Sequence, residues 1–414
     1  MKKICVLGLG YIGIPTACMF ATSGYQVHGV DIDENIIKII KSRNCPIEEP
    51  GMKTLLNASL NSGNLEISNT PVESDIFIIA VPTPIKDDKT MDYTFLKRAT
   101  EDIYPLLKQG NLVIVESTVT PGSTNEIVKP ILEKSGLNIG EELFLAHCPE
   151  RVLPGFILKE LINNDRIIGG INEKSALMAK EVYKSFVSGE IFITDLTSAE
   201  LTKVVENTYR DVNIAFSNEL ALVCDKLGVN VLDIIKFANR HPRVNILTPG
   251  PGVGGHCISV DPWFLIEKAP EITRITKLAR EINDNMPKYV VNKTSNILKN
   301  IKNPKIGIFG VTFKGNIDDV RNSPAITVCD ILYDMNINFK IYDPHVKYFK
   351  FELSDLETTI TDSDLILLLA DHKEFKYLSP EEIGSKMRNL NVFDTRNILD
   401  KEKWIKHNFN FVNI

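Results

Sequence analysis

The sequence lacks the features that mark membrane, disulfide-stabilised and nucleic-acid-binding proteins. Its longest apolar runs, such as Ile76–Val81 and Leu365–Ala370, have the length of core strands and fall far short of the roughly 20 residues of a membrane helix. Its seven cysteines are an odd number without paired spacing, so we expect reduced thiols and a cytoplasmic location. A formal net charge of -6 argues against nucleic-acid binding. The seven histidines are dispersed, and no metal site is predicted.

The chain is long enough for two or three domains, and it alternates strand-like and helix-like segments. This alternation predicts an α/β protein with two Rossmann-like doubly wound domains joined by a long central helix. We expect a nucleotide-binding domain over residues 1–195, a central helical region over 196–300 and a second Rossmann-like domain over 301–414.

The N-terminus carries a dinucleotide-binding pattern. A predicted strand, Lys3–Leu7, runs into the sequence G-x-G-x-x-G over residues 8–13, which opens a helical pattern. Gly10 would let the backbone approach a pyrophosphate at the helix N-terminus. A second strand, Gln26–Val30, ends in Asp31, where a carboxylate would bind the adenosine ribose and repel a 2'-phosphate. The pattern therefore favours NAD over NADP.

Three further predicted strands end in polar residues. They are Asp75–Val81, Asn111–Val115, which precedes Thr118, and Glu142–Ala146, which precedes Glu150. Ligands of open α/β sheets bind at the carboxyl ends of the strands. Thr118 is therefore either a hydrogen-bonding group for a hydroxyl or water, or a helix cap. Glu150 is either a general base or water-orienting group, or a surface glutamate.

A long helix is predicted in the middle of the chain. Thr197–Glu200 has the pattern of a capping box, and the apolar period continues to Gly228, which gives about 30 residues and roughly 45 Å of helix. Such a helix suits a hinge and a subunit interface. Lys203 and Asn207 lie one turn apart, so they either stabilise a developing negative charge or form a solvated face.

A glycine- and proline-rich loop over residues 249–256 precedes Cys257. A thiol on a tightly bent backbone is a candidate nucleophile, and the alternative is a small buried apolar residue. Asp261 either hydrogen-bonds a catalytic water or forms a turn with the next residue. His241 and Arg243 precede the loop, where an arginine would anchor an anionic substrate.

The last third begins after Pro304 and repeats the strand and helix alternation. The strand Lys305–Phe309 leads into a glycine-containing turn that is not a dinucleotide fingerprint. We therefore expect this domain to hold the uridine or phosphate end of a substrate. Lys314 and Arg321 are candidate contacts, with solvated charges as the alternative.

Taken together, these motifs resemble the UDP-glucose/GDP-mannose dehydrogenase family along nearly the whole chain. The matching motifs are Gly8-x-Gly10-x-x-Gly13, Val81-Pro82-Thr83-Pro84, Glu116-Ser117-Thr118, Pro149-Glu150, Lys203 with Asn207, Gly252-x-Gly254-Gly255-x-Cys257 with Asp261, and Phe313-Lys314 with Arg321. Residues 150–155, 241–245 and 254–257 look most like the branch that acts on UDP-N-acetyl-D-mannosamine. Pro154 stands where the glucose-specific branch usually has a glutamate.

The resemblance implies oxidation of a sugar C6 alcohol to a carboxylate with two NAD in succession. Cys257 would form a thiohemiacetal and then a thioester, Lys203 and Asn207 would stabilise the oxyanion, and Glu150, Thr118 and Asp261 would position the hydrolytic water. The implied NAD contacts are Gly10, Tyr11, Ile12, Asp31, Pro82, Thr83, Thr118 and Arg321. The implied UDP-sugar contacts are Glu150, Arg151, Val152, Lys203, Asn207, Arg210, His241, Arg243, Gly254, Phe313 and Lys314. Arg243 resembles an arginine that reaches the substrate of the neighbouring subunit, so a homodimer or larger assembly is implied.

Several other functions share part of this pattern. The same chemistry on UDP-N-acetylglucosamine or UDP-glucose is the nearest alternative. A two-electron β-hydroxyacid dehydrogenase would share the fingerprint and the lysine and asparagine pair but would not need Cys257. A sugar epimerase would retain its NAD and release no NADH, and a non-catalytic nucleotide-sugar sensor would bind its ligand without turnover.

Overall fold

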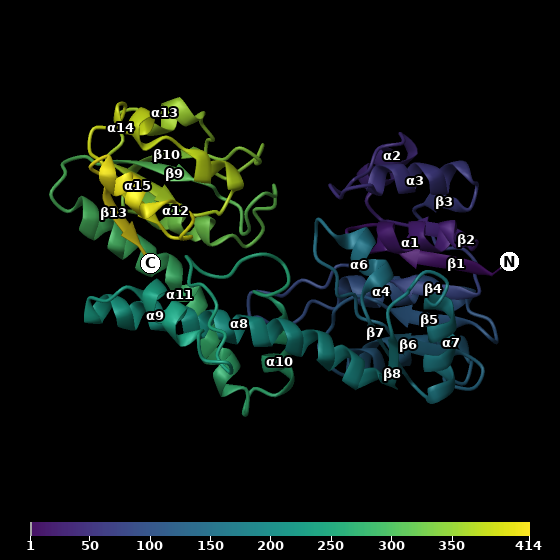
Figure 1. Ribbon diagram of the computed structural model, residues 1–414. Coiled ribbons are helices and arrows are strands. Elements are labelled where there is room, and N and C mark those ends of the chain that lie inside the picture. Colours follow the sequence, from purple (N-terminus) through teal and green to yellow (C-terminus); the bar gives the residue numbers. More distant parts are fainter. Residues whose placement is uncertain (1) are drawn as a thin grey trace. The chain divides into compact units, whose positions relative to one another are not determined.

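The computed structural model describes residues 2–414, which form two compact units (Figure 1). Unit 1 holds the described residues up to Glu206 together with Trp263–Pro270. Unit 2 holds Asn207–Pro262 and Glu271–Ile414. No helix among residues 2–414 combines the length and apolarity needed to cross a membrane.

Unit 1 is built on an eight-stranded sheet in the order β3-β2-β1-β4-β5-β6-β7-β8. Its strands are β1 Lys3–Leu7, β2 Gln26–Val30, β3 Leu65–Ser68, β4 Ile76–Ile79, β5 Leu112–Val115, β6 Phe144–His147, β7 Arg166–Gly170 and β8 Ile191–Asp195. Neighbouring strands are parallel except β6 and β7, which are antiparallel. The first two predicted strands are confirmed, and the next three are confirmed with small differences at their ends. β3, β7 and β8 were not predicted.

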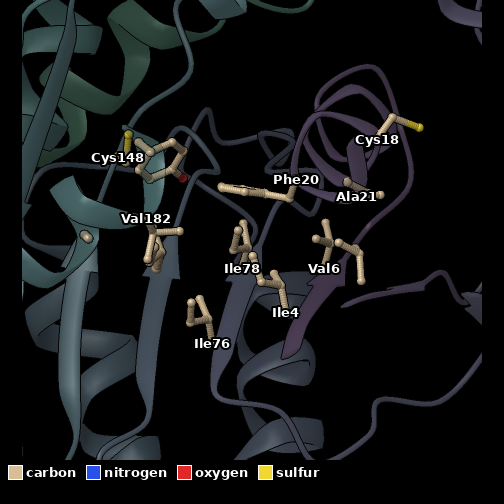
Figure 2. Close-up of a cluster of buried hydrophobic side chains, with 14 of the residues drawn as sticks. Ile4, Val6, Cys18, Phe20, Ala21, Ile76, Ile78, Cys148 and Val182 are labelled. Carbon is tan, nitrogen blue, oxygen red and sulfur yellow. The ribbon is translucent and has the colours of Figure 1, made fainter. Parts of the chain in front are cut away.

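The helices of unit 1 cover this sheet. They are α1 Gly13–Thr22, α2 Glu34–Lys41, α3 Met52–Asn61, α4 Thr94–Ile103, α5 Lys129–Leu132, α6 Ile157–Asn163 and α7 Glu173–Tyr183. Figure 2 shows part of the core: Ile4 of β1 and Ile78 of β4 point toward Phe20 of α1, and all three are fully buried. This packing fixes the start of α1 at the carboxyl end of β1, where the glycine pattern lies.

The long central helix is confirmed as α8, Leu196–Leu227, with 32 residues. The predicted capping box is wrong. The backbone N–H of Ser198 donates to Asp195 Oδ1 at 2.9 Å, so the cap lies at the end of β8. Glu200 turns inward instead and accepts hydrogen bonds from the backbone N–H groups of Gly122 and Thr124. Its carboxylate therefore fastens a loop of unit 1 to the first turns of the helix.

Unit 2 contains a second, fully parallel sheet in the order β10-β9-β11-β12-β13. Its strands are β9 Lys305–Phe309, β10 Asn338–Tyr342, β11 Leu365–Leu368, β12 Asn391–Asp394 and β13 Asn410–Asn413. The helices that follow α8 along the chain are α9 Val231–Ala238, α10 Asp261–Lys268, α11 Arg274–Leu298, α12 Pro324–Asp334, α13 Leu356–Ile360, α14 Pro380–Gly384 and α15 Lys401–Lys406. Of these, α10 begins in unit 2 and continues into unit 1. The predicted fold class, two Rossmann-like domains with a long central helix, is confirmed.

Candidate functional site

Three of the predicted catalytic residues meet in unit 2. The side chain of Asn207, on α8, donates from Nδ2 to Asp261 Oδ2 at 2.6 Å, and both residues are buried. The backbone N–H of Asp261 donates to the Cys257 carbonyl at 2.8 Å, so Cys257 lies in the turn that precedes α10. Cys257 is half-buried. The arrangement sets an amide and a carboxylate at the base of a loop that carries a thiol.

The glycines before Cys257 allow this loop to pack closely on the C-terminal domain. A Cβ added to Gly254 would lie 2.6 Å from the Asn322 carbonyl oxygen and 2.7 Å from Phe313 Cβ, closer than ordinary contact. Gly255 has a φ of +87°, and its N–H donates to the Arg321 carbonyl at 3.0 Å. The structure therefore brings Gly254, Phe313 and Arg321, three predicted binding residues, around the cysteine loop.

Charged groups hold the segment beneath this loop. Asp319 accepts hydrogen bonds from the Arg321 side chain at 2.6 and 3.0 Å, and His256 Nδ1 lies 3.8 Å from the same carboxylate. Burial works against the charge, but the hydrogen bonds from Arg321 hold the pKa of Asp319 below its ordinary value. The Asn322 side chain donates to the Gly255 carbonyl at 3.1 Å. Residues 319–322 thus hold the residues that precede Cys257 through polar contacts.

The fingerprint loop in unit 1 is tight on one side and open on the other. Gly8 has a φ of +91°, and a Cβ on Gly13 would lie 1.7 Å from the Gly8 carbonyl oxygen. Gly10, in contrast, has no atom within 4 Å of the position of a Cβ. Asp31 Oδ2 accepts a hydrogen bond from the Leu9 N–H at 2.7 Å, which stabilises the turn. The open backbone at Gly10, before the N-terminus of α1, fits the pyrophosphate of a dinucleotide.

The ends of β4 and β5 are tied together beside this loop. Thr83 Oγ1 donates to the Thr118 carbonyl at 2.6 Å, and Ser117 Oγ donates to the Val81 carbonyl at 2.7 Å. The helical turn that follows is preceded by Ser123, so the helix-cap alternative for Thr118 is wrong. Thr118 is half-buried at the carboxyl edge of the sheet, as predicted from its place after a strand.

Glu150 is buried, with 7% of its surface exposed, so the alternative of a surface glutamate is wrong. Its Oε2 accepts from the Arg166 guanidinium at 2.9 Å, and its Oε1 accepts from the Arg151 N–H at 2.7 Å. The Arg151 side chain is half-buried and pairs with Glu206 on α8, at 2.7 and 3.0 Å. A carboxylate held at both oxygens has a fixed direction, as a water-orienting group requires.

Models of three consecutive domains match most of the chain. Residues 2–187 match the NAD binding domain of the UDP-glucose/GDP-mannose dehydrogenase family, residues 197–285 its central domain, and residues 307–401 its UDP binding domain. The chain belongs to this family. It is therefore a nucleotide-sugar dehydrogenase with NAD as its cofactor, and the predictions of an enzyme, of NAD and of the family are confirmed.

Relatives with known names match nearly the whole chain. The UDP-N-acetyl-D-mannosamine dehydrogenase of Methanococcus maripaludis is 51% identical over 99% of this chain and 96% of its own. The NDP-N-acetyl-D-galactosaminuronic acid dehydrogenase of Ralstonia solanacearum is 43% identical over 95% of this chain and 96% of its own. The solved UDP-D-ManNAc dehydrogenase of Pyrococcus horikoshii is 42% identical, with a TM-score of 0.93 over 100% of this chain and 99% of that one.

The remaining predicted binding residues differ in exposure. Arg210, His241 and Arg243 of unit 2 are exposed, whereas Lys203, Val152, Lys314, Tyr11, Ile12 and Thr83 are half-buried and Pro82 is exposed. The individual roles of all these residues stay predictions.

Sequence reasoning missed a buried polar group behind Glu150. Burial raises the pKa of Glu116 to about 7, against the attraction of the Arg166 guanidinium. Tyr183, on α7, donates from its hydroxyl to Glu116 Oε1 at 2.5 Å. Glu116 stood in a motif quoted from the sequence, but nothing in the sequence marked Arg166, because its strand, β7, was not predicted.

The described residues also bring together three groups of a kind that bind metals, His345, His372 and Glu374. His372 Nδ1 accepts a hydrogen bond from the Asn316 N–H at 2.9 Å, and its Nε2 lies 3.1 Å from Asp343 Oδ2. Both ring nitrogens of the buried histidine are therefore engaged in hydrogen bonds that join three loops at the carboxyl edge of the second sheet, and the group has a structural explanation.

Proposed function

We propose that the chain oxidises the C6 alcohol of UDP-N-acetyl-D-mannosamine to the carboxylate in two successive two-electron steps. The observation that carries this proposal is Cys257 on a loop whose base is formed by the buried hydrogen-bonded pair Asn207 and Asp261. Its support on the substrate side is the 51% identity to a relative named for that sugar. When bound, NAD accepts the hydride that each oxidation step releases.

The first oxidation gives an aldehyde, which the Cys257 sulfur attacks. A carbon–sulfur bond forms at C6, the carbonyl electron pair moves to oxygen, and that oxygen takes a proton to give the thiohemiacetal. Lys203 and Asn207 are proposed to stabilise the negative oxygen, since a cation and an amide N–H both favour developing anionic charge. Loss of a hydride and a proton from the thiohemiacetal then gives the thioester.

Hydrolysis completes the reaction. The water oxygen bonds to the thioester carbon, and the carbon–sulfur bond breaks with its electron pair going to the Cys257 sulfur. One water proton re-forms the thiol and the other leaves to solvent, so the product is a carboxylate. Glu150, Thr118 and Asp261 are proposed to orient this water, because carboxylate and hydroxyl oxygens accept hydrogen bonds from it.

The UDP end of the substrate is assigned to the UDP binding domain, residues 307–401, with Phe313 and Lys314 as proposed contacts. Gly254 packs closely against Phe313, so these proposed UDP contacts lie next to the cysteine loop within unit 2. The sugar is assigned from the relatives and from Pro154, which replaces the glutamate usual in the glucose-specific branch.

We also propose a homodimer. One face of α8 leaves Tyr209, Phe216, Val223 and Leu227 exposed at 68%, 53%, 47% and 68%, with Phe237 of α9 exposed at 65%. The four α8 residues follow one another at intervals of seven, seven and four, so they form a stripe along the helix. An apolar stripe of this kind is typical of an interface, and a second copy is the proposed partner. None of the seven cysteines, all of which lie within residues 2–414, forms a disulfide, and this fits the proposed cytoplasmic location.

A Cys257→Ser variant tests the proposed chemistry. We expect it to form no net acid while binding NAD as the wild type does, because the thiol acts after the nucleotide is bound. Cys45→Ser is the matched control, since Cys45 is the other half-buried cysteine, and it should keep full acid formation. Undiminished acid formation by the Cys257→Ser variant would overturn the thioester route.

A further inference from the structure

Unit 1 buries an arginine that no step of the proposed function uses. Arg166 is the first residue of β7 and is 4% exposed. Its Nη2 donates to Glu150 Oε2 at 2.9 Å, and the two side chains are 5% and 6% exposed. Burying a guanidinium is costly unless it is paired, so Arg166 and Glu150 depend on each other to remain charged in this interior.

The arginine is itself held from several sides. Its guanidinium lies over the Tyr183 ring at 4.8 Å and near the Phe186 ring at 5.7 Å. Its Nη1 lies 3.6 Å from the Cys148 sulfur, and Cys148 is labelled in Figure 2 at the edge of the buried core. Burial opposes the positive charge, but the Glu150 carboxylate raises the pKa of Arg166 above its ordinary value. Arg166 is thus a rigid, permanently charged support for Glu150.

The carboxylate of Glu150 has capacity left after these contacts. Oε2 accepts from Arg166 and Oε1 from the Arg151 N–H, and each carboxylate oxygen has a second lone pair. A small pocket beside Glu150, lined also by Glu160, Asn164 and Arg166, has room for about one water molecule. Both the direction of the free lone pairs and a space beside them are therefore set by groups that are themselves held by hydrogen bonds.

We propose that Arg166 is a positioning residue, which holds the Glu150 carboxylate in the orientation that accepts a hydrogen bond from the water that hydrolyses the thioester. This inference rests on the proposed function. It assigns Arg166 to the hydrolytic step alone, so removal of its charge should leave both hydride transfers intact and slow the release of Cys257. A misdirected catalytic group costs on the order of 10²-fold in rate.

The test compares Arg166→Met with Glu150→Gln and with the double variant. In pre-steady-state mixing we expect Arg166→Met to form NADH in the first turnover as fast as the wild type, to have a steady-state rate lower by on the order of 10²-fold, and to show acylated Cys257 in the mass spectrum of quenched enzyme. If Arg166 acts through Glu150, the double variant is no slower than Glu150→Gln alone. Equal slowing of the first turnover and of the steady state, or additive losses in the double variant, would overturn the inference.

Two further variants keep the outcome decisive. Arg166→Lys retains a cation without the planar fork and should accumulate less acyl-enzyme than Glu150→Gln but more than the wild type, whether or not the methionine variant folds. Wild-type behaviour of the lysine variant would count against a positioning role. Arg280→Met, which removes a different fully buried paired arginine in unit 2, should lower stability without accumulating acyl-enzyme. A wild-type enzyme that releases fewer than two NADH per sugar would overturn the proposed function itself, and the inference with it.

Discussion

Unit 2 contains a buried ion pair whose carboxylate loses its cation in a single substitution. Arg280, on α11, donates from Nη1 to Asp211 Oδ1 on α8 at 2.6 Å, and the side chains are 2% and 0% exposed. In an Arg280→Met variant, Asp211 keeps a hydrogen bond from Asn283 Nδ2 at 2.8 Å but loses its cation. An unpaired buried charge costs about 3–5 kcal/mol, which corresponds to a fall of roughly 1–2 M in the urea midpoint of this unit.

The two tryptophans allow each unit to be followed by fluorescence. Trp263 lies in unit 1, and Trp404 lies in unit 2 and is 2% exposed. In a Trp263→Phe background the emission of Trp404 therefore reports the urea unfolding of unit 2. Lys386→Met removes an exposed pair with Glu357, with side chains 42% and 74% exposed, and should change stability by no more than about 0.5 kcal/mol.

A second substitution separates charge from packing. Adding Asp211→Asn to Arg280→Met removes the unpaired carboxylate and should restore more than half of the lost stability. Equal effects of Arg280→Met and Lys386→Met, or no recovery in the double variant, would refute this account of the ion pair.

Three other predictions concern different parts of the chain. The Glu116 carboxyl has its pKa raised by burial from 4.5 to about 7, so its contribution to stability is complete below pH 4.5 and is lost as the pH rises through 7. Relative to Glu116→Gln, the wild type should lose up to about 3 kcal/mol of unfolding free energy between pH 4.5 and 8, measured by the fluorescence of Trp263 in a Trp404→Phe background. Parallel pH profiles of the two proteins would contradict this. Gly254→Ala should displace the cysteine loop and lower kcat by on the order of 10²-fold, with NAD affinity unchanged. Gly384→Ala should be fully active, because the nearest contact of its Cβ would be the movable Leu390 side chain at 3.2 Å. Equal activity of the two variants would be evidence against the close packing of Gly254. Phe216→Arg should convert a dimer to a monomer in sedimentation experiments, while Lys226→Glu, an exposed position beside the stripe, should not; a dimer in both cases would exclude this face of α8.

Local patterns predicted the elements whose residues carry their own signal. The strand, glycine turn and acidic residue from Lys3 to Asp31 could be read directly, because each depends on residues close in sequence. The long helix α8 and the cysteine loop were also predicted, from the apolar period of the helix and from the glycines and prolines of the loop. The structure adds the reason for Gly254, whose missing side chain admits Phe313, 59 residues away by number.

The contacts that could not be predicted join residues far apart in the chain. Glu200 fitted a capping box, but its partners are Gly122 and Thr124, and burial of this carboxylate overrode the local pattern. β7, Arg166–Gly170, has only two apolar side chains before its two glycines, so neither the strand nor the pair of Arg166 with Glu150 had a periodic signal. Propensity and period in one sequence predict single helices and strands, but they do not predict which buried charges of different segments will pair.

The most direct test of the central claim is the yield of NADH per sugar consumed, measured in parallel with UDP-N-acetylmannosamine, UDP-N-acetylglucosamine and UDP-glucose. The proposed function predicts two NADH per molecule of UDP-N-acetylmannosamine and none with the other two sugars. Two NADH with another sugar alone would contradict the substrate assignment, and one or none with every sugar would contradict the four-electron chemistry.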